Sequence, residues 1–314
     1  MTTNSQFEIF HPALTEVADG LAFPEGPVCM PDGTLYVTEL AGGYVSKISV
    51  EGEKSRLSEN GGSPNGLAIG ADGALWCANS GGWDFHDVMG MKIPSSDLPA
   101  NHSGGRLERI DLATGSVEVV CAAVDGNALI GPNDLVVDAV GGIWFTDHAR
   151  SAGRVHHNGG IYYRSADGAV SEVAYPIPSP NGIGLSPDGT VLYAAETHTG
   201  RVYSWNVKDP GVLEFSNPLA GAGGNLVHGF GGGQLLDSLA IDAAGNVVVA
   251  TLVTGALSVI APDGELLEQW MLGDPMVTNV CFGGEGLRTA YATLSATGRL
   301  VSFDYPRGGL ALNA

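Results

Sequence analysis

The sequence has few charged residues, few cysteines and no long apolar run. Only 15% of its 314 residues are charged, and 34 acidic against 14 basic residues give a formal net charge of −20. Such a surface repels phosphate backbones and anionic lipids, so nucleic acid and membrane are poor partners. The apolar runs are too short to span a membrane, and the runs of Ala, Leu, Glu and Lys that build long helices are missing.

The cysteines and the N-terminus carry no metal or targeting signal. Cys29, Cys77, Cys121 and Cys281 lie in or beside apolar, strand-like runs, without a CxxC or Cys/His cluster. This is typical of reduced thiols inside a cytosolic protein. Residues 1–20 lack a basic segment followed by an apolar one, so no signal peptide is predicted. We expect a cytoplasmic monomer or homodimer.

Glycine, by contrast, is abundant at 47 residues, and it marks the turns of a weak repeat. Each copy has an apolar run, a Gly-containing turn and a second β-rich run; the copies occupy residues 23–40, 63–82, 131–149, 179–200, 235–255 and 277–298. A second hairpin follows each copy, so one unit makes a four-stranded antiparallel sheet. Sheets repeated at about 40–50 residues are propeller blades. The sequence therefore predicts an all-β, six-bladed β-propeller that forms one domain over residues 1–314.

Two parts of the chain fall outside the regular repeat. The last copy leaves too few residues for a complete blade, so we expect the segment near residues 15–18 to add its outer strand and close the ring. An insertion at 83–103 follows the second strand of its blade, which places it on the face where the inner strands begin. Its apolar side chains, among them Trp83 and Phe85, leave three interpretations open: a lid over a pocket, a dimer contact, or a loop packed on its own blade.

One oxygen-bearing side chain recurs at the start of the inner strand of every copy. These residues are Glu25, Asn65, Asn133, Asn181, Asp237 and Asn279. A closed ring would aim them at a common axis, and carboxylate and amide oxygens are hard donors that suit Ca²⁺, Mg²⁺ or Mn²⁺. For Asn65 and Asn279 a turn-forming role competes evenly with a role in the site. A glutamate at an apolar blade start has no turn role and is costly to bury unpaired, which favours a metal site.

The segments that carry these residues resemble a known family. FPEGP (23–27), PND (132–134), SPNGI (179–183), LDSLAID (236–242) and TNVCFGG (278–284) are similar, in this order, to the gluconolactonase/regucalcin family of six-bladed propellers. Squid-type diisopropylfluorophosphatase is a more distant relative. The resemblance implies that Glu25, Asn181 and Asp237 are metal ligands, and that Asn133 completes the metal shell or binds substrate. It implies one divalent ion, with Ca²⁺ as the leading candidate and Zn²⁺, Mn²⁺, Mg²⁺ and Fe²⁺ as alternatives.

The same resemblance implies an activity. The family hydrolyses lactones of sugar acids or related esters, so we expect a metal-dependent lactonase, with gluconolactone as the leading type of substrate. The ion would polarise the carbonyl, and Asp237, as general base or nucleophile, and Asn133 are the catalytic candidates. A hydrolase of another ester or phosphotriester, a non-catalytic binding propeller and a strictosidine-synthase-like propeller remain alternatives.

At a position that bears on substrate selection, the chain departs from part of the family. Some animal members use an Arg two residues before the position of Asn133 to hold the sugar, and here Gly131 stands there. The loop at 148–158 lies on the same face and offers several basic side chains as replacements: His148, Arg150, Arg154, His156 and His157. The substrate-binding candidates are Asn65, Asn133, His148 and Arg154, and His198 in the ETHTG loop has a similar chance of reaching the substrate.

Overall fold

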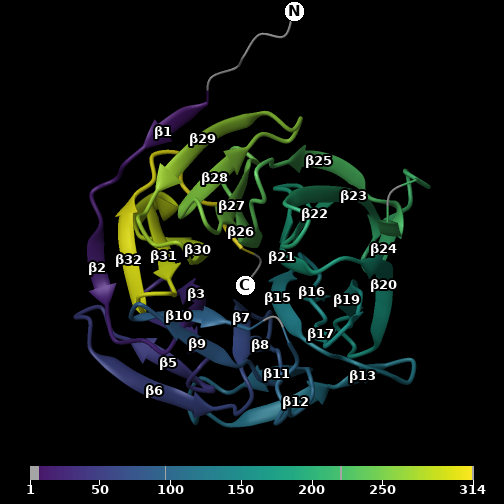
Figure 1. Ribbon diagram of the computed structural model, residues 1–314, viewed down its shortest axis with the longest axis horizontal. Coiled ribbons are helices and arrows are strands. Elements are labelled where there is room, and N and C mark those ends of the chain that lie inside the picture. The colour runs from purple at the N-terminus through teal and green to yellow at the C-terminus, as the bar shows by residue number, and fades with distance from the viewer. Residues whose placement is uncertain (1–6, 96, 220, 313–314) are drawn as a thin grey trace, which may run out of the picture.

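The chain folds as a ring of six β-sheets around a central axis, as Figure 1 shows. The computed structural model describes residues 7–95, 97–219 and 221–312; residues 1–6, 96, 220 and 313–314, which the predicted domain includes, lie outside it. Within these ranges the helices are two short 3₁₀ turns, η1 (Gly221–Gly223) and η2 (Glu285–Leu287). Neither has the length and apolar character that a membrane crossing requires. The predicted six-bladed β-propeller is confirmed.

In each blade the first three strands are antiparallel and follow the chain outward from the axis. The inner strands are β3 (Pro24–Cys29), β7 (Pro64–Ile69), β15 (Pro132–Val137), β21 (Pro180–Leu185), β26 (Leu236–Ile241) and β30 (Val277–Gly283). The second strands are β4 (Leu35–Glu39), β8 (Leu75–Asn79), β16 (Ile143–Asp147), β22 (Val191–Glu196), β27 (Val247–Thr251) and β31 (Thr289–Leu294). The third strands are β5 (Tyr44–Ile48), β11 (Arg106–Ile110), β19 (Gly159–Arg164), β23 (Arg201–Asp209), β28 (Ala256–Ile260) and β32 (Arg299–Asp304).

The outer strands vary more. Those of the first three blades and the fifth are β6 (Lys54–Glu59), β12 (Val117–Cys121), β20 (Val170–Ile177) and β29 (Leu266–Met271). In the fourth blade two short strands, β24 (Val212–Glu214) and β25 (Asn225–Gly229), both pair with β23. In the sixth blade the outer strand is β2 (Thr15–Ala18), which pairs antiparallel with β32 and joins the two ends of the chain.

The N-terminal segment also contributes a strand that the sequence pattern did not indicate. β1 (Glu8–Phe10) pairs parallel with β29 of the fifth blade. Phe10 stacks on Trp270 with a ring-centroid distance of 4.6 Å. Because β1 covers the outer edge of the fifth sheet, the segment protects two neighbouring blades from edge-to-edge pairing.

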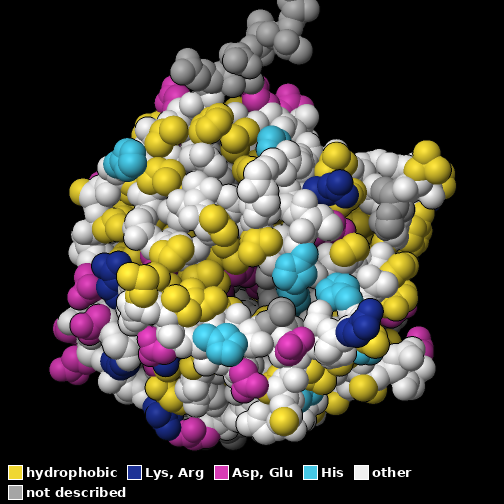
Figure 2. Space-filling model, in the orientation of Figure 1, with side chains coloured by type: hydrophobic (Ala, Val, Ile, Leu, Met, Phe, Trp, Pro, Cys, Tyr) yellow, Lys and Arg dark blue, Asp and Glu magenta, His cyan; other side chains and the backbone are white. Residues whose placement is uncertain are grey.

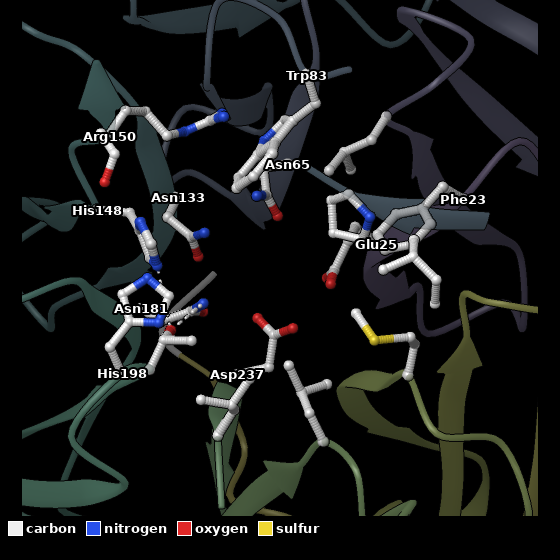
Figure 3. A pocket seen from close by; sticks show the side chains of 18 of the residues that line it. Phe23, Glu25, Asn65, Trp83, Asn133, His148, Arg150, Asn181, His198 and Asp237 are labelled. Atoms are coloured by element: carbon white, nitrogen blue, oxygen red, sulfur yellow. Dashed lines mark hydrogen bonds between the residues drawn. The ribbon is translucent and has the colours of Figure 1, made fainter. Parts of the chain in front are cut away.

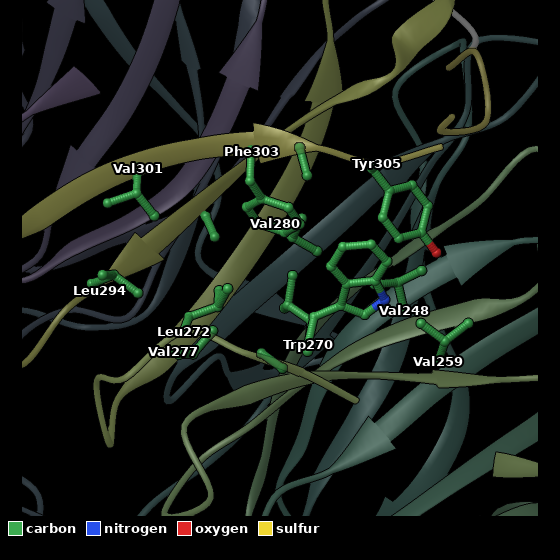
Figure 4. Packing of buried hydrophobic residues seen from close by; sticks show 14 residues of the cluster. Val248, Val259, Trp270, Leu272, Val277, Val280, Leu294, Val301, Phe303 and Tyr305 are labelled. Carbon is green, nitrogen blue, oxygen red and sulfur yellow. The ribbon is translucent and has the colours of Figure 1, made fainter. Parts of the chain in front are cut away.

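The hydrophobic core lies between neighbouring blades rather than at the axis. Figure 4 shows the cluster between the fifth and sixth blades, in which Trp270 stacks on Phe303 at 5.6 Å and contacts Tyr305. The alternating apolar residues of each sheet face the next sheet, as in other face-to-face sheet packings. This arrangement leaves the axis to the inner strands and their polar residues.

A bulge interrupts the pairing of every inner strand near its start. The register shifts between Glu25 and Val28 in β3, between Leu236 and Leu239 in β26, and at the corresponding place in the other four blades. A β-bulge bends its strand and re-aims the side chains beside it, and bulges are common next to active sites. The repeated bulge explains how residues on an inner strand, which would otherwise face a neighbouring blade, turn toward the axis.

Buried hydroxyl groups connect the blades around the axis. Thr38 Oγ1 donates to Asn65 O over 2.8 Å, and Thr146 Oγ1 donates to Asn181 O over 2.7 Å. In both cases a second strand holds the backbone of the residue at the start of the next blade's inner strand. The polar residues at the axis are therefore fixed by their neighbours as well as by their own sheets.

Short hairpins and loops cover the face where the inner strands begin. The insertion contains the hairpin of β9 (Phe85–Val88) and β10 (Met91–Pro94), and the loop of the third blade contains β17 (Ser151–Ala152) and β18 (Val155–His156). A further hairpin, β13 (Ala123–Val124) with β14 (Asn127–Ala128), follows β12. The insertion and the β17–β18 loop touch through an isolated bridge between Asp97 and Ser151.

Candidate functional site

A cavity of about 280 Å³ opens on this face at the end of the axis. Five of the six predicted axial residues line it: Glu25, Asn65, Asn133, Asn181 and Asp237. Figure 3 shows Glu25 and Asp237 pointing into the same space, with Asn133 and Asn181 across from Glu25. The structure therefore brings together the four residues that the resemblance assigns to metal binding.

Asn279, the sixth axial residue, lies outside this cavity. It faces a second cavity of about 810 Å³ at the opposite end of the axis, and its Nδ2 donates to Glu25 Oε2 over 3.1 Å. The second cavity is larger but holds neither Glu25 nor Asp237. We therefore place the chemistry in the smaller cavity, with Asn279 as a partner that holds Glu25.

Glu25 is buried and Asp237 is half-buried, and each carboxyl group faces the other's charge. Burial raises the pKa of Glu25 to about 7, although Asn279 and the Gly26 N–H donate hydrogen bonds to it. Burial, and then the charge of Glu25, raises the pKa of Asp237 well above its ordinary value. Within the described part of the chain, no Lys or Arg forms an ion pair with either carboxylate. Two such acids disfavour joint ionisation unless a cation lies near both.

The two amides contribute oxygen atoms that lack hydrogen-bond donors. Asn133 Oδ1 and Asn181 Oδ1 are buried, and neither accepts a hydrogen bond. Asn181 Nδ2 donates to Thr197 Oγ1 over 3.0 Å, which fixes the amide so that its oxygen is left free. A buried polar atom without a partner is costly, and a bound ion is one of the few ways to satisfy it.

These residues together fit a hard divalent cation. Two carboxylates without a cation partner and two unpaired amide oxygens are the donor types that such ions prefer. In the described ranges no group of three or more His, Cys, Asp or Glu side chains is arranged to hold a metal. An ion at this site would therefore depend on the two amide oxygens and on water to complete its shell.

Basic side chains line the part of the cavity beyond Asn133 and Asn181. His148, Arg150, His156 and His198 line it, whereas Arg154 is exposed and does not. His148 is hydrogen-bonded through Nε2 to Thr197 Oγ1 at 3.2 Å. Burial, and then the charge of His198, lowers the pKa of His148 to about 3, so its ring is neutral at physiological pH. Of the two substrate-binding candidates in this loop, His148 lines the cavity and Arg154 does not.

Arg150 lies where a side chain at position 131 would have projected. A Cβ added to Gly131 would come within 3.3 Å of Arg150 Nε. The guanidinium lies 3.0 Å from the Trp83 ring centroid and donates from Nη2 to Gly82 O, while Nε and Nη1 are buried without partners. Burial lowers the pKa of Arg150 to about 9. Arg150 thus brings a guanidinium group into the space beside position 131, where the Trp83 ring covers it.

Several residues of the cavity carry little or no signal in the sequence. Thr197, which contacts both Asn181 and His148, directly follows β22, and no sequence pattern marked it as part of the site. Apolar residues also line the cavity: Phe23, Leu40, Ile93, Pro94, Leu235, Leu252, Val253 and Met276. Most stand just before or after a strand, and their only signal was a position next to the repeat's polar residues.

Comparisons with known proteins agree with this architecture. Residues 23–296 match the family described as the SMP-30/Gluconolactonase/LRE-like region. The chain is 27% identical over 251 residues to lactonase drp35 of Staphylococcus haemolyticus, covering 79% of this chain and 69% of that protein. It is 27% identical over 232 residues to the gluconolactonase of Zymomonas mobilis, covering 71% of this chain but only 58% of that protein. The structure of a calcium-binding protein, regucalcin from Agrobacterium tumefaciens, has the same fold, with a TM-score of 0.75, 20% identity, and coverage of 98% of this chain and 100% of that one.

Proposed function

This chain belongs to the SMP-30/gluconolactonase/LRE-like family, and on that premise we propose that it hydrolyses a lactone with the help of one divalent cation. Relatives that are named for lactone hydrolysis support the reaction class. The observation that carries the proposal is the meeting, in one cavity, of two carboxyl groups without a Lys or Arg partner in the described residues and two unpartnered amide oxygens.

The proposed reaction requires a bound divalent cation. Held by Glu25, Asn133, Asn181 and Asp237, it would act as a Lewis acid that polarises the lactone carbonyl. Ca²⁺ is our first candidate because all four donors are hard oxygens. Neutral amides in place of two further carboxylates would leave part of its charge available to the substrate.

Asp237 is the residue that we assign to proton transfer. Its carboxylate takes a proton from the water that adds to the carbonyl carbon, and it returns this proton to the ring oxygen as the carbon–oxygen bond breaks. One water is consumed and one hydroxy acid is formed, so the step balances. A positioned base of this kind contributes about 10²–10⁴-fold to the rate. Asn133, whose amide points into the cavity beside His148 in Figure 3, orients the lactone.

A sugar-acid lactone such as gluconolactone is the first substrate to test, because a relative carries that name. Opening of the ring releases acid, so a pH indicator reports turnover. We expect activity that is lost with a chelator and restored by added Ca²⁺ or another divalent ion. Parallel assays with a phosphotriester and an open-chain aryl ester test the alternative hydrolases, and a binding propeller would turn over none of these compounds.

Two substitutions test the roles of the acids. Asp237→Asn and Glu25→Gln keep the size of each side chain but remove its charge, and each should lower kcat by at least about 100-fold. Asp209→Asn makes the same chemical change at an exposed position and is the matched control. Wild-type turnover in Asp237→Asn, with the fold intact by circular dichroism, would remove Asp237 from the mechanism.

A further inference from the structure

The cavity has two chemically unlike sides. His148, Arg150 and His198 lie on the side of Asn133 and Asn181, whereas the side of Glu25 is apolar, beginning with Phe23 (Figure 3). We call the second side the apolar wall and define it by six residues: Phe23, Leu40, Ile93, Leu252, Val253 and Met276. In Figure 2 hydrophobic side chains gather along one part of the rim of the central hollow, and histidines stand at other parts of the rim.

The wall comes from three blades and the insertion. Leu40 follows β4, Leu252 and Val253 follow β27, and Met276 precedes β30, so these residues stand at the same end of the axis. The insertion adds Ile93 from β10 and contacts both the first and the sixth blade. Phe85 packs on Phe23 with ring centroids 4.9 Å apart, and Lys92 N donates to Ala296 O over 3.1 Å. The hairpin is therefore a built part of the cavity.

Val253 also points to a ligand at this wall, because its backbone conformation lowers the stability of the fold. Its backbone has a φ of 67°, a left-handed conformation that is rare for a β-branched residue, and its side chain is 68% exposed at the mouth of the cavity. Backbone strain of this kind persists where the surrounding structure enforces it and is concentrated at functional sites. An exposed, strained valine next to a cavity is explained by a ligand that covers it.

The chemistry of the wall discriminates among lactones. None of its six side chains carries an oxygen, an N–H or an O–H group. A ring hydroxyl that faced this wall would lose its hydrogen bonds to water and gain none, whereas a methylene group would leave water at no such cost. A polyhydroxylated lactone must therefore turn its hydroxyls away from this wall, toward the polar side chains that line the rest of the cavity.

We propose that the apolar wall binds an alkyl substituent on the lactone ring, and that alkyl-substituted lactones are preferred to sugar-acid lactones. The inference deepens the proposed function and rests on it for the reaction. A cavity of about 280 Å³ is at the small end of ligand pockets, which span roughly 300–1,000 Å³. We therefore expect a short chain, of about three to five carbons, that points from the ring toward Val253.

The test is a series of δ-lactones that differ only in chain length. The substrates are δ-valerolactone, δ-hexalactone, δ-octalactone and δ-decalactone, compared with glucono-δ-lactone in the same pH-indicator assay. Each methylene that reaches the wall should raise kcat/KM by about fourfold, the equivalent of about 0.8 kcal/mol. δ-Octalactone should then exceed δ-valerolactone by about 60-fold and exceed glucono-δ-lactone as well. Equal rates along the series, or a preference for glucono-δ-lactone, would overturn the inference while the lactonase proposal stands.

Variants connect the preference to the wall. Val253→Thr keeps the shape of the side chain and adds a hydroxyl, and Met276→Gln adds an amide of similar length. Each should reduce the gain per methylene from about fourfold to twofold or less. Val212→Thr makes the first change on an exposed residue of β24, away from the cavity, and should leave the chain-length dependence as in the wild type.

A binding measurement separates failure of the wall from failure of the reaction. δ-Lactams with the same alkyl chains replace the ring oxygen by N–H and resist hydrolysis, so calorimetry reports their affinity directly. Affinity that rises with chain length, and falls in Val253→Thr, supports the wall even if no lactone is turned over. Affinity that does not change with chain length refutes it, whatever the activity.

Discussion

Asn279 donates a hydrogen bond from Nδ2 to Glu25 Oε2 over 3.1 Å, although the two residues lie 254 positions apart in the chain. The bond joins the inner strand of the last blade to that of the first, so it forms only when the ring closes. It also leaves Glu25 with a fixed orientation at the cavity. The orientation of Glu25 in the site therefore depends on closure of the ring.

Asn279→Ala should weaken divalent-cation binding without removing a ligand. Loss of a partner that orients a ligating side chain typically costs about 10–100-fold in metal affinity. We expect this loss for Ca²⁺ in calorimetric titration of chelator-treated protein. Asn127→Ala, at an exposed amide in β14, is the control. An unchanged Ca²⁺ affinity in Asn279→Ala would show that Glu25 does not need this hydrogen bond.

Thr197→Val tests whether the hydroxyl next to β22 orients Asn181. The valine keeps the shape but cannot accept the hydrogen bond from Asn181 Nδ2, so the amide is free to turn its oxygen away from the cavity. We expect weaker Ca²⁺ binding and a lower kcat/KM, with both largely restored in Thr197→Ser. If the serine variant behaves like the valine variant, packing of the methyl group, rather than the hydrogen bond, is what matters.

His148 should make the protein less stable in acid. Its pKa is about 3 in the folded state because of burial, below the value of 6.5 that applies when the chain is unfolded. Below pH 6.5 the unfolded chain therefore binds a proton at His148, whereas the folded protein does not. Protonation thus favours the unfolded state, and the stability that is present at neutral pH is lost as the pH falls. From pH 7 to pH 5 this amounts to about 2 kcal/mol in the free energy of unfolding.

Urea denaturation of His148→Gln at the two pH values measures this effect. The variant should lose about 2 kcal/mol less than the wild type between pH 7 and pH 5. His157→Gln, in the exposed part of the same loop, should follow the wild type. Parallel pH dependence in the wild type and His148→Gln would mean that His148 accepts a proton within the fold.

Leu300→Ala should destabilise the closed ring. Leu300 lies in β32 opposite Ala18 of β2 and is fully buried. It packs in a cluster with Leu21, which precedes the first blade, and with Leu35, Val37 and Ile48 of that blade. Truncation of a fully buried leucine costs about 2–5 kcal/mol. Urea denaturation checks the loss, with Val119→Ala on an exposed position of β12 expected to change stability by about 0.5 kcal/mol or less. A loss as small as that of Val119→Ala would indicate that the first and last blades are not held together by this cluster.

The repeated fold was predictable from the sequence because its signals are local. A Gly-containing turn between two β-rich runs forms a hairpin wherever it stands, and six such units in order leave few alternatives to a ring. β1 was missed because three residues without a turn signal pair in parallel with a strand far along the chain. Such a pairing is determined by the partner strand and leaves no pattern in the segment itself.

The candidate site, too, was predictable from the sequence only where a residue carries a local signal. Glu25 and Asp237 stood out in the sequence because an acid at the start of an apolar strand has no local role, and the strand order alone put them at one end of the axis. The sequence could not decide between Arg150 and Arg154, nor distinguish Asn279 from Asn65, nor find the wall that begins at Phe23. In each case the direction of a side chain depends on contacts from another blade or from the insertion. Those contacts exist only after the ring has closed, so only the tertiary structure decides them.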